Sequence, residues 1–232
     1  MQPSPVALDS AGRLVAFVGR GGDIEIWDTV NNKRQQSIRA TGVATLALRP
    51  DGRAVAWSGE DGKVQVRENG VERIPWTFEG PVKALAYSGD GSLLAAATER
   101  RVSVVTSKGE PRDMPGLEPN QRIQGVALSA AGDQIAVAVE DTMLLWNARK
   151  PAQLPIVLRG HGSYIRAMAF RRHTTGAKGL LLSTGNERTL LWSSTEALAA
   201  LVCEKTRGRP LSEQEWERWV GAGVGHEKAC PE

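Results

Sequence analysis

The sequence lacks the features that mark several classes of protein. No window approaches the roughly 18 to 20 consecutive apolar residues of a membrane span, so no membrane association is expected. The first residues, MQPSPVALDS, show no basic stretch followed by an apolar core, and we expect a cytoplasmic protein without a secretory signal. The net charge is only +3. Because the basic residues are dispersed, with only small pairs at Arg100/Arg101 and Arg171/Arg172, nucleic-acid binding is not expected and is kept only as a weak alternative.

Sequence patterns of common catalytic sites are also missing. There is no Gly-x-Ser-x-Gly elbow, no phosphate-cradling glycine loop and no His-Glu-x-x-His helix. The glycine cluster VGRGGD at residues 18–23 joins two expected strands and opens no helix, which indicates a sharp turn. Acidic residues are scattered at turn positions, so no hydrolytic carboxylate pair stands out. We therefore predict no catalytic residue and no cofactor.

The chain has only two cysteines, Cys203 and Cys230, both among its last thirty residues. A disulfide between them would restrict the unfolded chain and stabilise this segment by about 3 kcal/mol. In a reducing cytosol the alternative is two buried thiols side by side. His226 would make a third zinc ligand, but structural zinc takes about four, so no metal site is predicted.

A repeat of about forty residues organises what is present. An alternating apolar segment, a turn with glycine and a second apolar segment recur as VALDSAGRLVAFV, TLALRPDGRAVAW, ALAYSGDGSLLAAA and GVALSAAGDQIAVAV. The turn glycines Gly12, Gly52, Gly91 and Gly132 are 40, 39 and 41 residues apart. With 25 glycines and 12 prolines, the chain suits many tight turns between short strands.

Each pair of segments leads into a third alternating strand, ending at Trp27, Arg67, Val105, Trp146 and Trp192. Alternation at period two predicts that one face of each strand is buried, and the short links require antiparallel pairing. A fourth strand per unit is predicted in KRQQSIRA, VERIPWTFE, PRDMPGL and QLPIVLR, where proline suits an outer edge. The predicted fold class is all-β.

The period, the Gly160-His161 pair, the Pro50-Asp51-Gly52 turn and the Trp27-Asp28 strand end resemble the WD-repeat β-propeller family. The resemblance implies four-stranded blades around a central channel over residues 1–192, at about 5–29, 43–79, 82–117, 123–158 and 158–192. It also implies a hydrogen-bonded set of histidine, serine or threonine, tryptophan and a turn aspartate within a blade.

In the last unit, His161, Ser183 and Trp192 fill three places of that set by position. Its turn offers Asn186 and Glu187 but no aspartate, so the network is expected to be incomplete. The other units are further eroded. Packing, rather than a polar network, is expected to hold most blades.

Five units raise the question of ring closure, because closure removes exposed sheet edges. Only Met1 to Ser4 precede the first strand, too few residues to lend a strand to the last blade. The units therefore form a small or incompletely closed ring, or the chain is the carboxyl-terminal part of a larger ring. We expect the second arrangement.

Residues 193–232 depart from the repeat. Ser193 with Glu196, and Ser212 with Glu215, have the spacing of capping boxes, which predicts a C-terminal helical hairpin packed on the last blade. This segment also resembles the end of many bacterial WD-repeat proteins, in which the propeller follows a signalling or effector module. That likeness implies a kinase, a caspase-like protease or a switch ATPase as the linked domain.

The sequence thus favours a non-enzymatic interaction module, acting as sensor or scaffold for a protein partner or a linked effector domain. The expected partner rim comprises polar turns before the third strands and the segment beside Gly160-His161, with the residues Arg20, Glu60, Arg100, Glu140, Arg188, Tyr164 and Arg166. Any one of them could instead be a solvated turn residue. The alternative function is an enzyme with a pocket at the channel mouth, which clustered ionisable groups with perturbed pKa values in that pocket would favour.

Overall fold

The computed structural model describes residues 5–106, 111–117, 121–148, 150, 152–171, 181–192, 212 and 214. These residues form five antiparallel sheets. Sheet 1 contains β1 (Val6–Leu8), β2 (Leu14–Val18), β3 (Ile24–Asp28) and β4 (Lys33–Ile38). Sheet 2 contains β5 (Thr45–Leu48), β6 (Ala54–Ser58), β7 (Lys63–Glu68) and β8 (Val71–Thr77). Sheet 3 contains β9 (Ala84–Tyr87), β10 (Leu93–Ala97), β11 (Val102–Thr106) and β12 (Arg112–Asp113).

Sheet 4 contains β13 (Ile123–Leu128), β14 (Gln134–Val139), β15 (Thr142–Asn147) and β16 (Ile156–Leu158). Sheet 5 contains β17 (Ala167–Phe170), β18 (Leu181–Thr184) and β19 (Thr189–Trp192) over the described residues. In every sheet the strands follow one another in chain order, so the predicted all-β series of five antiparallel units is confirmed. The predicted helical hairpin falls in 193–232, almost all of which lies outside the described residues.

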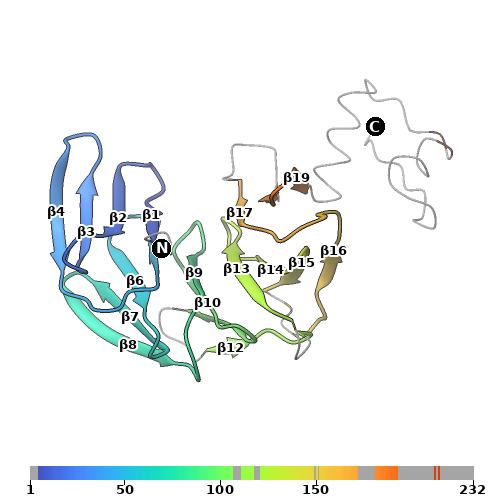
Figure 1. The fold of residues 1–232 in the computed structure, drawn as a ribbon, viewed down its shortest axis with the longest axis horizontal. Coiled ribbons are helices and arrows are strands. Elements are labelled where there is room, and N and C mark those ends of the chain that lie inside the picture. Colours follow the sequence, from blue (N-terminus) through green and yellow to red (C-terminus); the bar gives the residue numbers. More distant parts are fainter. Residues whose placement is uncertain are drawn as a thin grey trace.

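The five sheets stand side by side in an arc, with sheet 1 at one end and sheet 5 at the other (Figure 1). The first strands β1, β9, β13 and β17 lie on the inside of the arc (Figure 1). Contacts join β1 to β5, β5 to β9, β9 to β13 and β13 to β17. The arc therefore has the radial arrangement of a propeller, with the first strands around its axis.

Packing between consecutive sheets forms the core. Because side chains alternate across a strand, each sheet has two faces; we call the face toward the preceding sheet its front face and the face toward the following sheet its back face. One apolar cluster fills each of the four sheet-to-sheet interfaces. In sheet 2, for example, Trp57 packs forward on sheet 1 and Val64 packs back on sheet 3, and neither is more than 1% exposed.

The turn between the first and second strands is built in the same way in three sheets. The residue after the first strand accepts a hydrogen bond from the backbone N–H five positions later: Leu14 N to Asp9 Oδ1 at 3.0 Å, Leu93 N to Ser88 Oγ at 2.9 Å and Gln134 N to Ser129 Oγ at 2.9 Å. Such side-chain acceptors favour turns over continued strand. The turn glycine takes a positive φ, as at Gly52 with 73°, which explains the glycine in the sequence period.

Among the described residues, no helix is long and apolar enough to cross a membrane.

Adjacent leucines of β18 test the two-faced packing. Leu181 is 2% exposed on the front face, whereas Leu182 is 45% exposed on the back face. Leu181→Ala leaves a cavity and is expected to lower the free energy of unfolding by about 2 to 5 kcal/mol. Leu182→Ala should cost about 1 kcal/mol or less. Urea unfolding of both variants measures the difference, and equal losses would contradict the assignment of faces.

Candidate functional site

The loops of the five sheets lie at the two ends of the strands. At the rim end, the turn between the second and third strands of one sheet meets the link that leads into the first strand of the following sheet. Backbone hydrogen bonds tie them together, from Ile123 N to Glu99 O at 3.1 Å and from Ile165 N to Glu140 O at 2.8 Å. The turns between first and second strands lie at the other end, which we call the turn end.

All seven predicted rim residues are exposed at the rim end. Four of them, Arg20, Glu60, Arg100 and Glu140, are distributed one to a sheet over sheets 1 to 4. They do not form one compact cluster. The structure gathers the other three, Tyr164, Arg166 and Arg188, at sheet 5.

The sheet 5 cluster is held by the turn between β18 and β19. Arg166 donates from Nε to Asn186 Oδ1, and Arg188 donates from Nη1 to Gly160 O at 3.2 Å. Asn186 N donates to Ser163 Oγ at 3.3 Å, which fastens the turn to the link that carries Tyr164. Tyr164 is 57% exposed and lies two residues before Arg166 in that link. One exposed aromatic residue and two exposed arginines therefore lie on adjoining rim-end loops of sheet 5.

Beneath this surface, His161, Ser183 and Trp192 form a hydrogen-bonded chain. His161 Nε2 lies 2.7 Å from Ser183 Oγ, and Trp192 Nε1 donates to the same oxygen at 2.7 Å. His161 is 6% exposed and Ser183 is 1% exposed. The network links the rim-end loop to the middle and third strands of sheet 5, which is a structural role.

The network has no fourth member among the described residues. His161 Nδ1 is buried without a partner there. Asn186, which the sequence placed in the turn where the family has an aspartate, instead accepts the hydrogen bond from Arg166. Burial lowers the pKa of His161, and the positive charge of Arg188 lowers it further. A protonated ring would also carry a second buried N–H, so the neutral form is favoured.

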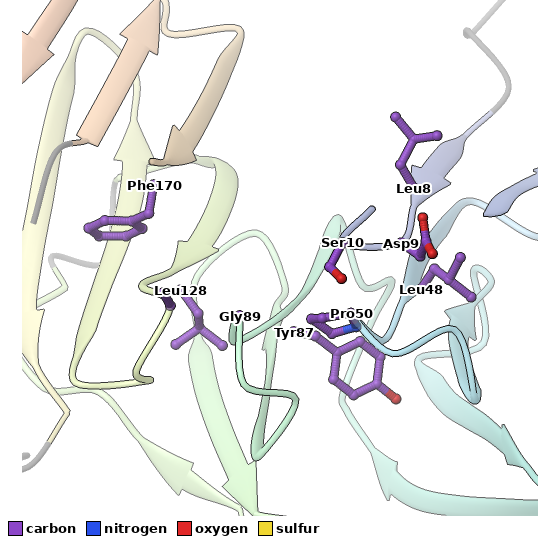
Figure 2. Close-up of a pocket in the computed structure, with 10 residues that line it drawn as sticks. Leu8, Asp9, Ser10, Leu48, Pro50, Tyr87, Gly89, Leu128 and Phe170 are labelled. Atoms are coloured by element: carbon purple, nitrogen blue, oxygen red, sulfur yellow. The ribbon is translucent and has the colours of Figure 1, made fainter. Parts of the chain in front are cut away.

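A cavity of about 240 Å³ lies at the turn end. Its wall takes one residue at the same position from each first strand, namely Leu8, Leu48, Tyr87, Leu128 and Phe170, and it is completed by Asp9, Ser10, Pro50, Gly89 and Ala130. Figure 2 shows Phe170 and Leu128 on one side of the cavity and Leu8, Leu48, Pro50 and Tyr87 on the other. This cavity was not predicted, although the repeat alignment places these five residues at equivalent strand ends.

The cavity lining contains two ionisable side chains, Asp9 and Tyr87. Burial raises the pKa of Tyr87 to about 12, so its phenol stays protonated at neutral pH. Asp9 already uses Oδ1 to accept the Leu14 N–H of its turn. The lining contains no histidine, lysine, arginine or cysteine.

Asp28 is a buried carboxylate whose role sequence reasoning missed. Its Oδ1 accepts the N–H groups of Val30 and Asn31 at 3.0 and 2.9 Å, and its Oδ2 accepts the Asn31 side chain at 2.9 Å. These hydrogen bonds, led by the backbone of Asn31, lower the pKa of Asp28 to about 2. Asp28 therefore closes the turn between β3 and β4. The sequence feature that could have identified this role is an aspartate directly before the turn residues Thr29 to Asn32.

The candidate disulfide and the alternative of two buried thiols both concern Cys203 and Cys230, which lie outside the described residues. Within the part of the chain that is described, no group of three or more His, Cys, Asp and Glu side chains could hold a metal ion.

Ser183→Ala tests the hydrogen-bonded chain. It removes the shared acceptor and leaves the N–H of the half-buried Trp192 without a partner, so we expect a loss of about 1 to 3 kcal/mol in the free energy of unfolding. Thr189→Ala is the control, because it removes an exposed hydroxyl that donates to Thr184 Oγ1 at 3.0 Å. The control should cost no more than about 0.5 kcal/mol in the same urea titration.

Stability should also depend on pH through His161. Its pKa in the folded protein lies below the ordinary value near 6.5, so the unfolded chain binds more protons once the pH falls below that value. The stabilisation is complete above about pH 6.5 and declines below it. We expect His161→Gln to flatten the free energy of unfolding measured between about pH 7 and pH 5. His173→Gln and His226→Gln are the matched variants, and a slope that disappears with either of them would refute the assignment.

Comparison with known proteins gives distant matches. No protein-family model matches the chain. Over 179 residues, 72% of the chain, it is 27% identical to the Periodic tryptophan protein 2 homolog of Dictyostelium discoideum. Over 167 residues, 68% of the chain, it is 26% identical to NACHT domain- and WD repeat-containing protein 1 of Mus musculus.

The matched regions cover 19% of the first relative and 11% of the second, so the chain spans less than a fifth of the length of either. Both relatives are WD-repeat proteins. The chain is therefore similar in sequence to WD-repeat proteins, and its antiparallel sheets are those of a WD-like propeller.

Proposed function

We propose that the chain is a non-enzymatic protein-interaction module that acts as a scaffold or sensor, with its partner surface at the rim end of sheet 5. The observation that carries the proposal is the cluster of Tyr164, Arg166 and Arg188. Tyrosine and arginine are enriched where interfaces gain most of their energy, because each combines a large contact area with hydrogen-bond donors.

The cluster is also arranged in advance for binding. Arg166 and Arg188 are each held by one hydrogen bond, to Asn186 and to Gly160, and both keep further donors for a partner. Side chains that are already positioned lose less conformational entropy on binding. Two guanidinium groups beside an aromatic ring suit a partner segment with carboxylates next to an apolar side chain.

The composition of the turn-end cavity supports a non-enzymatic role. Its side chains are mainly aliphatic and aromatic, and its carboxylate, Asp9, is engaged in a turn. An enzyme pocket would be expected to combine ionisable groups with pKa values tuned toward neutrality. Here the pKa of Tyr87 is moved away from neutrality, to about 12.

We further propose that the module serves an effector domain. The name of the mouse relative joins a NACHT domain to WD repeats in one protein. That combination is a property of the relative, and it supports, for this chain, a partner that is either a separate protein or a domain of the same polypeptide.

Photocrosslinking can identify the partner and test its site together. A photoreactive phenylalanine analogue at position 164 should capture the partner in cells, whereas the same analogue at position 30 should not. Val30 is the matched position, because it is 74% exposed in the turn between β3 and β4, at the turn end.

The captured partner then allows an affinity measurement. The double variant Tyr164→Ala with Arg166→Ala should weaken binding by about tenfold or more, as expected for interface anchors. Val30→Ala should leave the dissociation constant unchanged in the same calorimetric titration. Equal crosslinking at both positions, or an unchanged affinity of the double variant, would refute a partner surface at this end of sheet 5.

A further inference from the structure

The lining of the turn-end cavity is mostly apolar and contains one carboxylate, that of Asp9. Leu48 and Leu128 are 4% and 6% exposed and form a buried part of the wall. Leu8 is 58% exposed, so the wall is open to solvent where β1 ends. A ligand that enters beside Leu8 therefore buries its apolar part against the ends of the other first strands.

Hydrogen bonds between neighbouring turns hold the wall in place. Ser10 N donates to Pro50 O at 3.0 Å, which joins the turns of sheets 1 and 2. Gly89 N donates to Ser129 O at 3.2 Å, which joins the turns of sheets 3 and 4. Ser10, Pro50 and Gly89 line the cavity themselves. Because the wall is fixed before a ligand arrives, little conformational entropy is lost on binding.

Asp9 gives the cavity a negative charge that no lining residue neutralises, because the lining has no histidine, lysine or arginine. Its Oδ1 accepts the Leu14 N–H at 3.0 Å, which fixes the carboxylate at the end of β1 and leaves Oδ2 for a ligand. Figure 2 shows this carboxylate between Leu8 and Leu48. A cation beside it gains from the weak screening near apolar walls, whereas an anion is repelled.

Size and lining together define the chemical class of the ligand. A cavity of roughly 150 Å³ lined by aliphatic and aromatic side chains accepts a benzene ring. The volume of about 240 Å³ therefore suits a molecule with about ten non-hydrogen atoms. The apolar walls favour an aliphatic or aromatic body, and Asp9 favours a positively charged group at one end of it.

We propose that the turn-end cavity is a binding site for a small organic cation, an amine with a compact apolar body whose ammonium group pairs with Asp9. The site lies at the opposite end of the strands from the rim-end partner surface and shares no residue with the cluster of Tyr164, Arg166 and Arg188. It goes beyond the proposed interaction function and does not rest on it.

Three probes with one body separate the effect of charge from that of shape. Phenylpropylamine, phenylpropanol and phenylpropanoate share a phenyl ring and a three-carbon chain and differ in the charge of the head group. In nuclear magnetic resonance titrations of the 232-residue chain, the amine should bind about fivefold or more tightly than the alcohol. The carboxylate should show no saturable binding.

Contacts locate the bound amine without any substitution. Nuclear Overhauser effects should join the phenyl ring of the probe to the methyl groups of Leu48 and Leu128, which lie on opposite sides of the cavity (Figure 2). This measurement uses the unaltered chain and so does not depend on the folding of a variant.

Asp9→Asn removes the charge but keeps a side-chain oxygen that can accept the Leu14 N–H, so the turn is retained. The amine and the alcohol should then bind within about twofold of each other. Asp61→Asn is the matched control, because Asp61 Oδ1 accepts the Lys63 N–H at 3.1 Å in a turn at the rim end. The preference for the amine should be unchanged in this control.

Four results would overturn the proposal. The first is no saturable binding of the amine, and the second is equal or tighter binding of the alcohol or the carboxylate. The third is contact of the bound amine with residues outside the cavity alone. The fourth is a preference for the amine that persists in folded Asp9→Asn protein, which would place the cation elsewhere. None of these results bears on the rim-end partner surface, so the two proposals fail separately.

Discussion

The structure depends on the burial of both faces of a sheet against its neighbours along the chain. A single four-stranded sheet of this size cannot bury both of its faces alone, so it is stable only between two others. The four apolar clusters show how this is met: sheets 2, 3 and 4 are covered on both sides, and aliphatic or aromatic side chains fill every interface. Because the interfaces use the same strand positions, each sheet adds to the arc in the same orientation as the one before it.

Several buried polar groups have hydrogen-bond partners that compensate for lost water, whereas Trp57 Nε1 is buried between sheets 1 and 2 without one. Ser183 is buried within sheet 5, but its hydroxyl serves Trp192 and His161. Asp28 is 1% exposed, yet five hydrogen bonds from its turn and neighbours favour its charged form. Both residues lie near strand ends, where the backbone leaves the ladder and free donors occur. Polar chemistry is therefore displaced from the interfaces to the two ends of the strands.

Much of this architecture could be predicted, since it depends on local patterns. Alternation at period two identified the strands, and the glycine spacing identified the units, because a positive φ is required at the same place in each turn. His161, Ser183 and Trp192 were placed by family position, and the structure brings them within hydrogen-bonding distance. What could not be predicted depends on distant partners. The pairing of Asn186 with Arg166 follows from how two loops meet, and the cavity at the turn end follows from the convergence of five strands on one axis.

The turn end and the rim end of the strands differ in how their loops use hydrogen bonds, and this difference indicates separate roles for the two sets of loops. At the turn end, acceptor side chains such as Asp9, Ser88 and Ser129 each accept a backbone N–H and so close their own turns. At the rim end, Arg166 and Arg188 each donate one hydrogen bond within the protein, and both residues are exposed. The charge of the rim-end loops can therefore change without affecting the turns at the turn end. The turn-end loops can keep their hydrogen bonds without limiting which partner the rim-end loops bind. A repeat that separates these requirements along its strands can change its partner while it keeps its packing, which is the property a scaffold needs.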